Sequence, residues 1–159
     1  MNIEKGMLRF GIIFGLLAFP TLFRKQKNKL WLSLFLINGI TNHLIDRILV
    51  RKKKLKYPKR HLPKIFKVNV TYDYLVCSYI SVWFCQTTYN DKFSKILAKS
   101  FLFAVPQAAY EIFLERKTKL LHFKRGWEWY HSALLVLLVK LLSRCYLSVA
   151  KLILKKKKQ

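Results

Sequence analysis

The chain has 159 residues, of which 53% are hydrophobic and 15% aromatic, and its 31 Lys and Arg residues stand against only 7 acids. This length suits one domain, so a single membrane domain is expected over residues 1–159. The formal charge of +24 would suit a nucleic-acid-binding protein. The basic residues, however, form islands between apolar runs about as long as a bilayer is thick. This pattern favours a multi-pass membrane protein, with lipid and not nucleic acid as its partner.

The first apolar run covers residues 7–23. Lys5 and Arg9 precede its apolar stretch, as in a signal peptide, but no small-residue cleavage site follows. An uncleaved first span is therefore expected. Pro20 is expected to kink or end this helix, because proline lacks the backbone N–H that a helix interior needs.

Three further runs, residues 30–50, 68–89 and 96–114, are long enough to cross a bilayer. The run 68–89 is rich in β-branched and aromatic residues, which would suggest strands in a soluble protein. Because it contains neither Gly nor Pro, a helix embedded in lipid is the better interpretation.

The last segment, residues 127–154, begins with an apolar stretch and then places Lys140, Arg144, Lys151 and Lys155 on one side of a helix. The sequence predicts an amphipathic basic helix that lies along the membrane interface. A fifth span with snorkelling cations is the alternative. The predicted fold class is all-α, an integral membrane helical bundle of four transmembrane helices plus this C-terminal helix, or of five transmembrane helices.

With four spans, both termini and the loops 51–67 and 115–125 share one side of the membrane, and they hold most of the basic residues. Lys and Arg accumulate on the cytoplasmic side, so the N- and C-termini are predicted to be cytoplasmic. With five spans this asymmetry largely vanishes.

The loop 51–67 holds nine Lys or Arg in 17 residues, interleaved with apolar side chains. Cations near an anionic membrane surface contribute about 1 kcal/mol each, so this loop is expected to bind anionic lipid headgroups. The residues expected to do so are Lys52, Lys53, Lys54, Lys56, Lys59, Arg60, Lys64 and Lys67.

Polar residues interrupt the second apolar run. Asn38, Asn42 and Asp46 follow at intervals of four and lie on one helical strip. Asp73 enters the third run from the same side of the membrane, and Glu111 stands near the matching end of the fourth. At 1.5 Å of rise per residue, the three acids are predicted at one depth, roughly 5–8 Å below the cytoplasmic boundary.

Two interpretations of these polar residues stay open. They form hydrogen bonds that hold the helices together, or they line a cytoplasm-facing polar pocket that binds a cation or relays protons. The candidate pocket comprises Asn38, Asn42, His43, Asp46, Arg47, Asp73, Gln107, Glu111 and His131. Arg47 beside Asp46 suits a structural pair better than a metal ligand, and no metal-binding or catalytic motif is present. No metal, cofactor or catalytic residue is therefore predicted, and Cys77, Cys85 and Cys145 are expected to be buried small hydrophobes.

Four stretches are distinctive in combination: "LRFGIIFGLLAFPTLFRK", "NGITNHLIDRILV", "KYPKRHLPKIFKVN" and "GWEWYHS". Together they resemble a family of small integral membrane proteins from spore-forming Firmicutes, bacilli and clostridia. The resemblance implies a bacterial plasma membrane or a spore membrane, and it carries over no catalytic residue.

The expected function is that of a structural or accessory membrane component linked to sporulation. Its expected partners are the lipid bilayer, another membrane protein or a second copy of the chain. The alternative is a small membrane enzyme or a cation- or proton-handling protein that uses Asp46, Asp73, Glu111 and His131.

Overall fold

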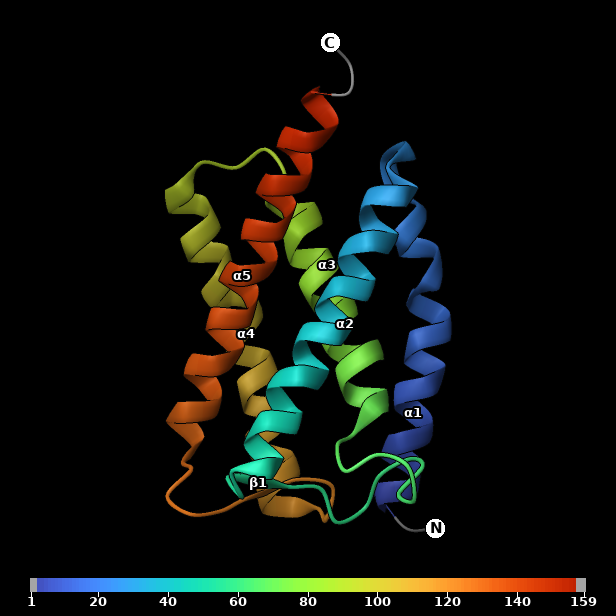
Figure 1. Ribbon diagram of the computed structural model, residues 1–159, viewed down its shortest axis with the longest axis vertical. Coiled ribbons are helices and arrows are strands. Elements are labelled where there is room, and N and C mark those ends of the chain that lie inside the picture. Colours follow the sequence, from blue (N-terminus) through green and yellow to red (C-terminus); the bar gives the residue numbers. More distant parts are fainter. Residues whose placement is uncertain (1–2, 157–159) are drawn as a thin grey trace.

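Residues 3–156 are described by a computed structural model, in which long helices of alternating direction run side by side (Figure 1). In chain order, the elements are α1 (Ile3–Ala18), the 3-10 helix η1 (Phe19–Gln26), α2 (Asn28–Arg51), β1 (Leu55–Lys56), the π-helical stretch η2 (Tyr72–Cys77), α3 (Ser78–Thr87), α4 (Phe93–Lys117), β2 (His122–Phe123) and α5 (Trp129–Lys156). The helical bundle that the sequence predicts is confirmed at this level.

Three helices in the described part of the chain are long and apolar enough to cross a membrane, namely Ile3–Arg24, Phe93–Lys117 and Trp129–Lys156. Their outward faces expose large apolar side chains, among them Leu16 on α1 and Leu102 on α4. Exposed apolar surface on this scale is unfavourable in water and matches the acyl-chain region of a bilayer. These helices mark the chain as a membrane protein.

The first helix changes character at the proline, as predicted. Regular α-helix ends at Ala18, and the 3-10 helix η1 starts at Phe19 with Pro20 in its first turn. Proline is tolerated there because the first N–H groups of a helix have no partner in any case.

Glycines allow α1 and α2 to pack closely against the chain around η2. A Cβ atom added at Gly11 would lie 3.1 Å from Thr71 Cγ2, and one added at Gly15 would lie 2.8 Å from a Leu75 methyl group. On α2, a Cβ atom at Gly39 would lie 2.6 Å from the Tyr74 ring. Small residues four apart, as in Gly11 and Gly15, are a common device for close contact between membrane helices.

Helix α5 packs against α4 and runs along the bundle instead of across its end (Figure 1). Its 28 residues correspond to about 42 Å at 1.5 Å per residue, which exceeds the roughly 30 Å of a bilayer's hydrocarbon core. The basic stripe of this helix was expected to face the membrane interface. That expectation is wrong for Lys140, which is fully buried among the helices.

Two loops, residues 52–69 and 118–128, fold together over one end of the bundle, and we call them the cap. Within the cap, β1 pairs antiparallel with β2. Leu55 and Tyr57 are buried there with Leu114 and Leu121 in an apolar cluster. The loop expected to cover the membrane surface therefore has one side packed into the protein core.

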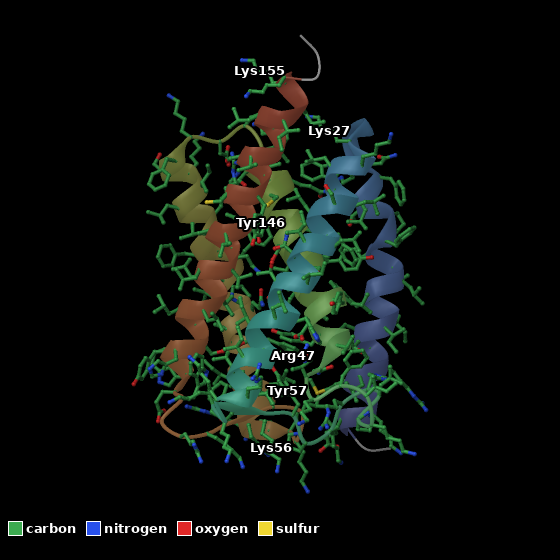
Figure 2. The ribbon with its side chains drawn as sticks, viewed as in Figure 1. Lys27, Arg47, Lys56, Tyr57, Tyr146 and Lys155 are labelled. Carbon is green, nitrogen blue, oxygen red and sulfur yellow. The ribbon has the colours of Figure 1, made fainter. Side chains whose placement is uncertain are left out.

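The described ends of the chain lie at opposite ends of the bundle, with Ile3 beside the cap and Lys156 away from it (Figure 1). Nitrogen-bearing side chains gather at both ends, with Lys56 at the cap and Lys27 and Lys155 at the far end (Figure 2). The last basic residues, 157 and 158, lie outside the described residues.

The three cysteines form no disulfide with one another and differ in exposure. Cys77 and Cys85 are buried, as predicted, whereas Cys145 is exposed on α5. The expectation that all three are buried is therefore wrong for Cys145, which stands on the outer side of its helix.

Candidate functional site

A small cavity of about 30 Å³ lies just inside the cap, between α2, η2, α4 and α5. The side chains of Asp46, Asp73 and Glu111 all line it, so the three acids predicted at one depth do lie together. We call this hollow the acidic cavity. A water molecule needs about 10–15 Å³ of such volume, so the cavity has room for one or two waters and for no larger ligand.

The cap supplies the partner of Asp46. The Tyr57 hydroxyl donates a hydrogen bond to Asp46 Oδ2. Burial, together with the charge of Asp46, raises the pKa of Tyr57 well above its ordinary value. The phenol therefore stays protonated at neutral pH and donates to the carboxyl group of Asp46.

Both oxygens of Glu111 have donors from other helices. The Tyr72 hydroxyl, from η2, donates to Oε1 at 2.9 Å, and the Ser132 hydroxyl, from the first turn of α5, donates to Oε2. Glu111 thereby links α4 to two neighbouring helices through hydrogen bonds.

Asp73 lies in the π-helical stretch and is less well satisfied. Its backbone carbonyl accepts the Ser78 hydroxyl at 3.1 Å, while its carboxylate lines the cavity together with that of Asp46. Asp73 Oδ2 lies 3.9 Å from His43 Nδ1. Neither of these two atoms has a hydrogen-bond partner among residues 3–156. Wide π-helical turns often occur at functional sites, and this pair is the least satisfied part of the cavity's surroundings.

Polar contacts continue from the cavity into the middle of the bundle. Gln107 lines the cavity, and its Oε1 accepts a hydrogen bond from Lys140 Nζ at 2.6 Å. Lys140 also donates to Ser81 Oγ at 3.1 Å. Further along α2, Asn38 Oδ1 accepts the hydroxyl of Ser143. A column of polar side chains thus runs through the interior of an otherwise apolar bundle.

Five of the nine predicted pocket residues line the acidic cavity: Asn42, Asp46, Asp73, Gln107 and Glu111. Two others adjoin it, since Asn38 belongs to the polar column and His43 approaches Asp73 from outside.

The remaining two predicted residues are elsewhere. Arg47 borders a separate hollow beside residues 65–68, and no ion pair joins it to Asp46 in the described part of the chain. The expected Asp46–Arg47 pair is therefore wrong, because the cap's tyrosine holds the carboxylate instead. His131 is also outside, since its Nδ1 accepts the backbone N–H of Glu128 at 3.1 Å and its ring stacks on Trp127 at 5.2 Å.

Three residues that shape the cavity were absent from the sequence prediction: Tyr57, Tyr72 and Ser132. Tyr57 stands in a basic loop, where its alternation with Leu55 was the only sign of a strand with one buried face. Tyr72 and Ser132 lie near the ends of apolar runs, where tyrosine is common because it favours the membrane interface. Their sequence positions therefore do not mark them as cavity residues.

No group of three or more His, Cys, Asp or Glu side chains within residues 3–156 is arranged to hold a metal ion. The donors that reach Asp46 and Glu111 are hydroxyl groups, which a cation would have to displace. In this arrangement the carboxylates of Asp46 and Glu111 are engaged by protein donors.

The predicted headgroup-binding residues divide into two groups. Exposed on the cap are Lys52, Lys53, Lys56, Lys64 and Lys67. The others have partners within the protein: Lys54 donates to the Arg125 carbonyl at 2.9 Å, and Lys59 lies 3.2 Å from Glu4. Arg60 donates to three backbone carbonyl groups of its own loop, at Tyr57, Pro63 and Phe66, so it shapes the loop and is not available to lipid.

A scan of protein-family models finds no match for this chain, and searches of curated proteins and of solved structures find none either. The apolar helices, the basic cap and the acidic cavity are therefore the features from which a function is inferred.

Proposed function

We propose that this chain is a five-span protein of a bacterial cell membrane with a structural or accessory role. Besides the three apolar helices, the proposed spans are α2, with 24 residues or about 36 Å at 1.5 Å per residue, and the continuous helix that η2 and α3 form. The polar side chains that set α2 apart from a typical span face the bundle interior, as Asn38 does. This is the usual position of polar groups within a membrane.

The orientation we propose has the cap in the cytoplasm, since its loop carries nine Lys or Arg in 17 residues. An odd number of spans then places the C-terminus outside the cell. A phosphatase fused after Gln159 is expected to be active, and a fluorescent protein fused there and exported unfolded is expected to be dark. The opposite pair of results would refute five spans.

The observation that carries the structural role is that the acidic cavity is full of protein contacts. Its hydroxyl donors come from the cap, η2 and α5, while the acids themselves come from α2, η2 and α4. Hydrogen bonds between membrane helices contribute about 0.6–2 kcal/mol each. A cavity of about 30 Å³ leaves no room for a substrate, so the cluster acts as a clip that joins the helices to the cap.

Conservative substitution of the acids tests this role. We expect Glu111→Gln and Asp46→Asn to lower the midpoint of thermal unfolding in detergent, whereas Glu128→Gln, an exposed acid at the same end, leaves it unchanged. The host phenotype should fall only as far as the amount of folded protein in the membrane falls. A variant that accumulates normally but loses the phenotype would contradict a purely structural role.

A second function, proton handling, is favoured by the pair His43 and Asp73, whose facing atoms lie 3.9 Å apart. Both groups change charge with protonation, and they connect the cavity with the hollow that Arg47 borders. Proteoliposomes loaded with a pH-sensitive dye distinguish the two functions. Proton flux that disappears in Asp73→Asn and persists in Glu128→Gln would establish proton handling, and no flux above that of empty liposomes would exclude it.

The link to sporulation is supported by the resemblance of four stretches of this chain to membrane proteins of spore-forming Firmicutes. We propose that deletion of the protein lowers the yield of heat-resistant spores and leaves vegetative growth unchanged. Equal spore yields in deletion and parent strains would exclude this role.

A further inference from the structure

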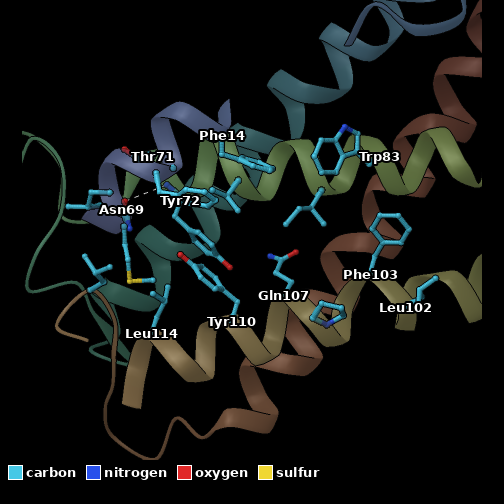
Figure 3. Close-up of a pocket in the computed structure, with 18 residues that line it drawn as sticks. Phe14, Asn69, Thr71, Tyr72, Trp83, Leu102, Phe103, Gln107, Tyr110 and Leu114 are labelled. Atoms are coloured by element: carbon cyan, nitrogen blue, oxygen red, sulfur yellow. Dashed lines mark hydrogen bonds between the residues drawn. The ribbon is translucent and has the colours of Figure 1, made fainter. Parts of the chain in front are cut away.

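A second hollow runs along the flank of the bundle, and we call it the flank groove. It lies between α1 and α4, with η2 and α3 as its floor, and its volume is about 490 Å³, within the roughly 300–1,000 Å³ of small-molecule sites. Figure 3 shows Trp83 and Phe103 toward one end, Asn69 and Leu114 toward the other, and Phe14 between them. The groove is thus an elongated and mainly apolar slot.

The rims of the flank groove are open to the surroundings of the bundle. Phe10 on α1 is 64% exposed and Leu102 on α4 is 68% exposed, and both line the groove. In a membrane, these rims face the acyl chains of lipids. A lipid chain is therefore the occupant that has direct lateral access.

Apolar contact alone cannot make such a site selective. An acyl chain gains no hydrophobic free energy by leaving other lipid chains for an apolar groove, because both environments exclude water. Preference for one lipid must come from its headgroup, at the end of the groove where the bundle meets water. That end is formed by Met7, Asn69, Leu114 and Leu120, beside the cap.

Cations surround this end of the groove. Lys5 precedes Met7 on α1, Lys117 follows Leu114 by three residues, and Lys119 adjoins Leu120; the three lysines are exposed. The nearby acid Glu4 is already paired with Lys59 at 3.2 Å. Glu115, which directly follows Leu114, is the other acid near this end, and the three lysines outweigh it. The net charge at the mouth of the groove is therefore positive, which complements an anionic headgroup.

We propose that the flank groove binds one acyl chain of an anionic phospholipid, whose headgroup lies against Lys5, Lys117 and Lys119. The groove shares Tyr72 and Gln107 with the acidic cavity. A bound chain packs against the ring of Tyr72, whose hydroxyl donates to Glu111 at 2.9 Å. Lipid on one side of Tyr72 and the acid cluster on the other thus support the same side chain.

Trp83 lines the groove and serves as a fluorescent reporter. The protein is placed in nanodiscs that contain brominated phosphatidylglycerol or brominated phosphatidylcholine, and the quenching assigned to Trp83 is the difference between the natural chain and Trp83→Phe. We expect half-maximal quenching at a severalfold lower mole fraction of phosphatidylglycerol. The double variant Lys5→Gln/Lys119→Gln should remove this preference, while Lys92→Gln/Lys95→Gln, at the opposite end of the bundle, should retain it.

A bulky side chain in the groove tests the position of the acyl chain. Val76→Phe fills the floor of the groove and should reduce quenching of Trp83 severalfold, whereas Leu134→Phe on the exposed face of α5, a matched increase in size outside the groove, should not. If Val76→Phe fails to fold, Leu102→Phe at the open rim replaces it. Equal quenching by the two lipids, or quenching unaffected by either groove variant, would indicate nonspecific boundary lipid and overturn the proposal.

Discussion

The contact between Lys140 and Gln107 offers a sharp test of the polar interior. Lys140 is fully buried, and its Nζ donates to Gln107 Oε1 at 2.6 Å and to Ser81 Oγ at 3.1 Å. Lysine has three donor hydrogens and no acceptor, so it relies on these oxygens. We predict that Gln107→Leu is more harmful to stability than Lys140→Met, although both remove the same contact.

The asymmetry follows from what each substitution leaves behind. Gln107→Leu removes the nearest acceptor and keeps the buried cationic group, and a hydrogen bond to a charged group contributes about 1.5–3 kcal/mol. Lys140→Met removes the charge itself and leaves the neutral amide of Gln107, which still donates a hydrogen bond from Nε2 to Cys77 Sγ at 3.4 Å. Replacing a buried charge by an apolar side chain of similar volume is often neutral or stabilising.

Thermal unfolding in a mild detergent measures the difference. For a chain of this size, 1 kcal/mol shifts the unfolding midpoint by about 2–4 °C, so Gln107→Leu should lower it by roughly 3–12 °C. Gln86→Leu is the matched control, because Gln86 donates only to the neutral Thr21 carbonyl, at 2.8 Å. Adding Lys140→Met to Gln107→Leu should recover part of the loss. A smaller effect for Gln107→Leu than for Gln86→Leu would refute the reasoning.

Three other predictions concern packing, the cap and cysteine exposure. Gly39→Ala should lower the free energy of unfolding by about 1–3 kcal/mol through overpacking. Gly11→Ala should lower it less, because its Cβ would lie 3.1 Å from the nearest atom instead of 2.6 Å. The reverse order of unfolding midpoints would contradict the close approach at α2. Tyr57→Phe should cost about 1–3 kcal/mol by removing the donor to Asp46. Because the pKa of Tyr57 is raised in the folded protein, its contribution to stability is complete below about pH 10, the pKa of a free tyrosine. This contribution is lost as the pH rises toward the pKa of Tyr57 in the folded protein. Denaturation measured as a function of pH should show this loss in the natural chain and not in Tyr57→Phe. A membrane-permeant maleimide should label Cys145 in the folded protein and the buried cysteines only after unfolding, as mass spectrometry of the labelled peptides will show.

The common depth of the acids could be predicted from sequence because it depends only on helix rise and on where each run ends. Asp46, Asp73 and Glu111 stand at similar distances from the ends of their runs, and antiparallel helices bring such positions together. Tyr57 could not be placed in this way. Its burial depends on the pairing of β1 with β2, a contact between loops more than 60 residues apart that no local pattern encodes.

The basic stripe of α5 shows a different limit. A helix with cations on one side has the same periodicity whether that side faces lipid headgroups or a polar interior. The partners across the interface decide between them, and here they are Gln107 on α4 and Ser81 on α3. His131 illustrates the same point. Its position in the first turn of α5 predicts its depth, but it does not predict that its ring nitrogen accepts the backbone N–H of Glu128.

Tyr72 connects the two hollows of the molecule. One side of its ring lines the flank groove, and its hydroxyl holds Glu111 at the edge of the acidic cavity. Protein interiors are close-packed and transmit displacement, so whatever occupies the groove restrains the orientation of this hydroxyl. Loss of the Tyr72 hydroxyl would leave Glu111 with Ser132 as its remaining donor in the described chain. The flank groove and the acid cluster that joins α4 to η2 and α5 therefore share one side chain, and on our proposal the stability of this bundle depends on the lipid around it.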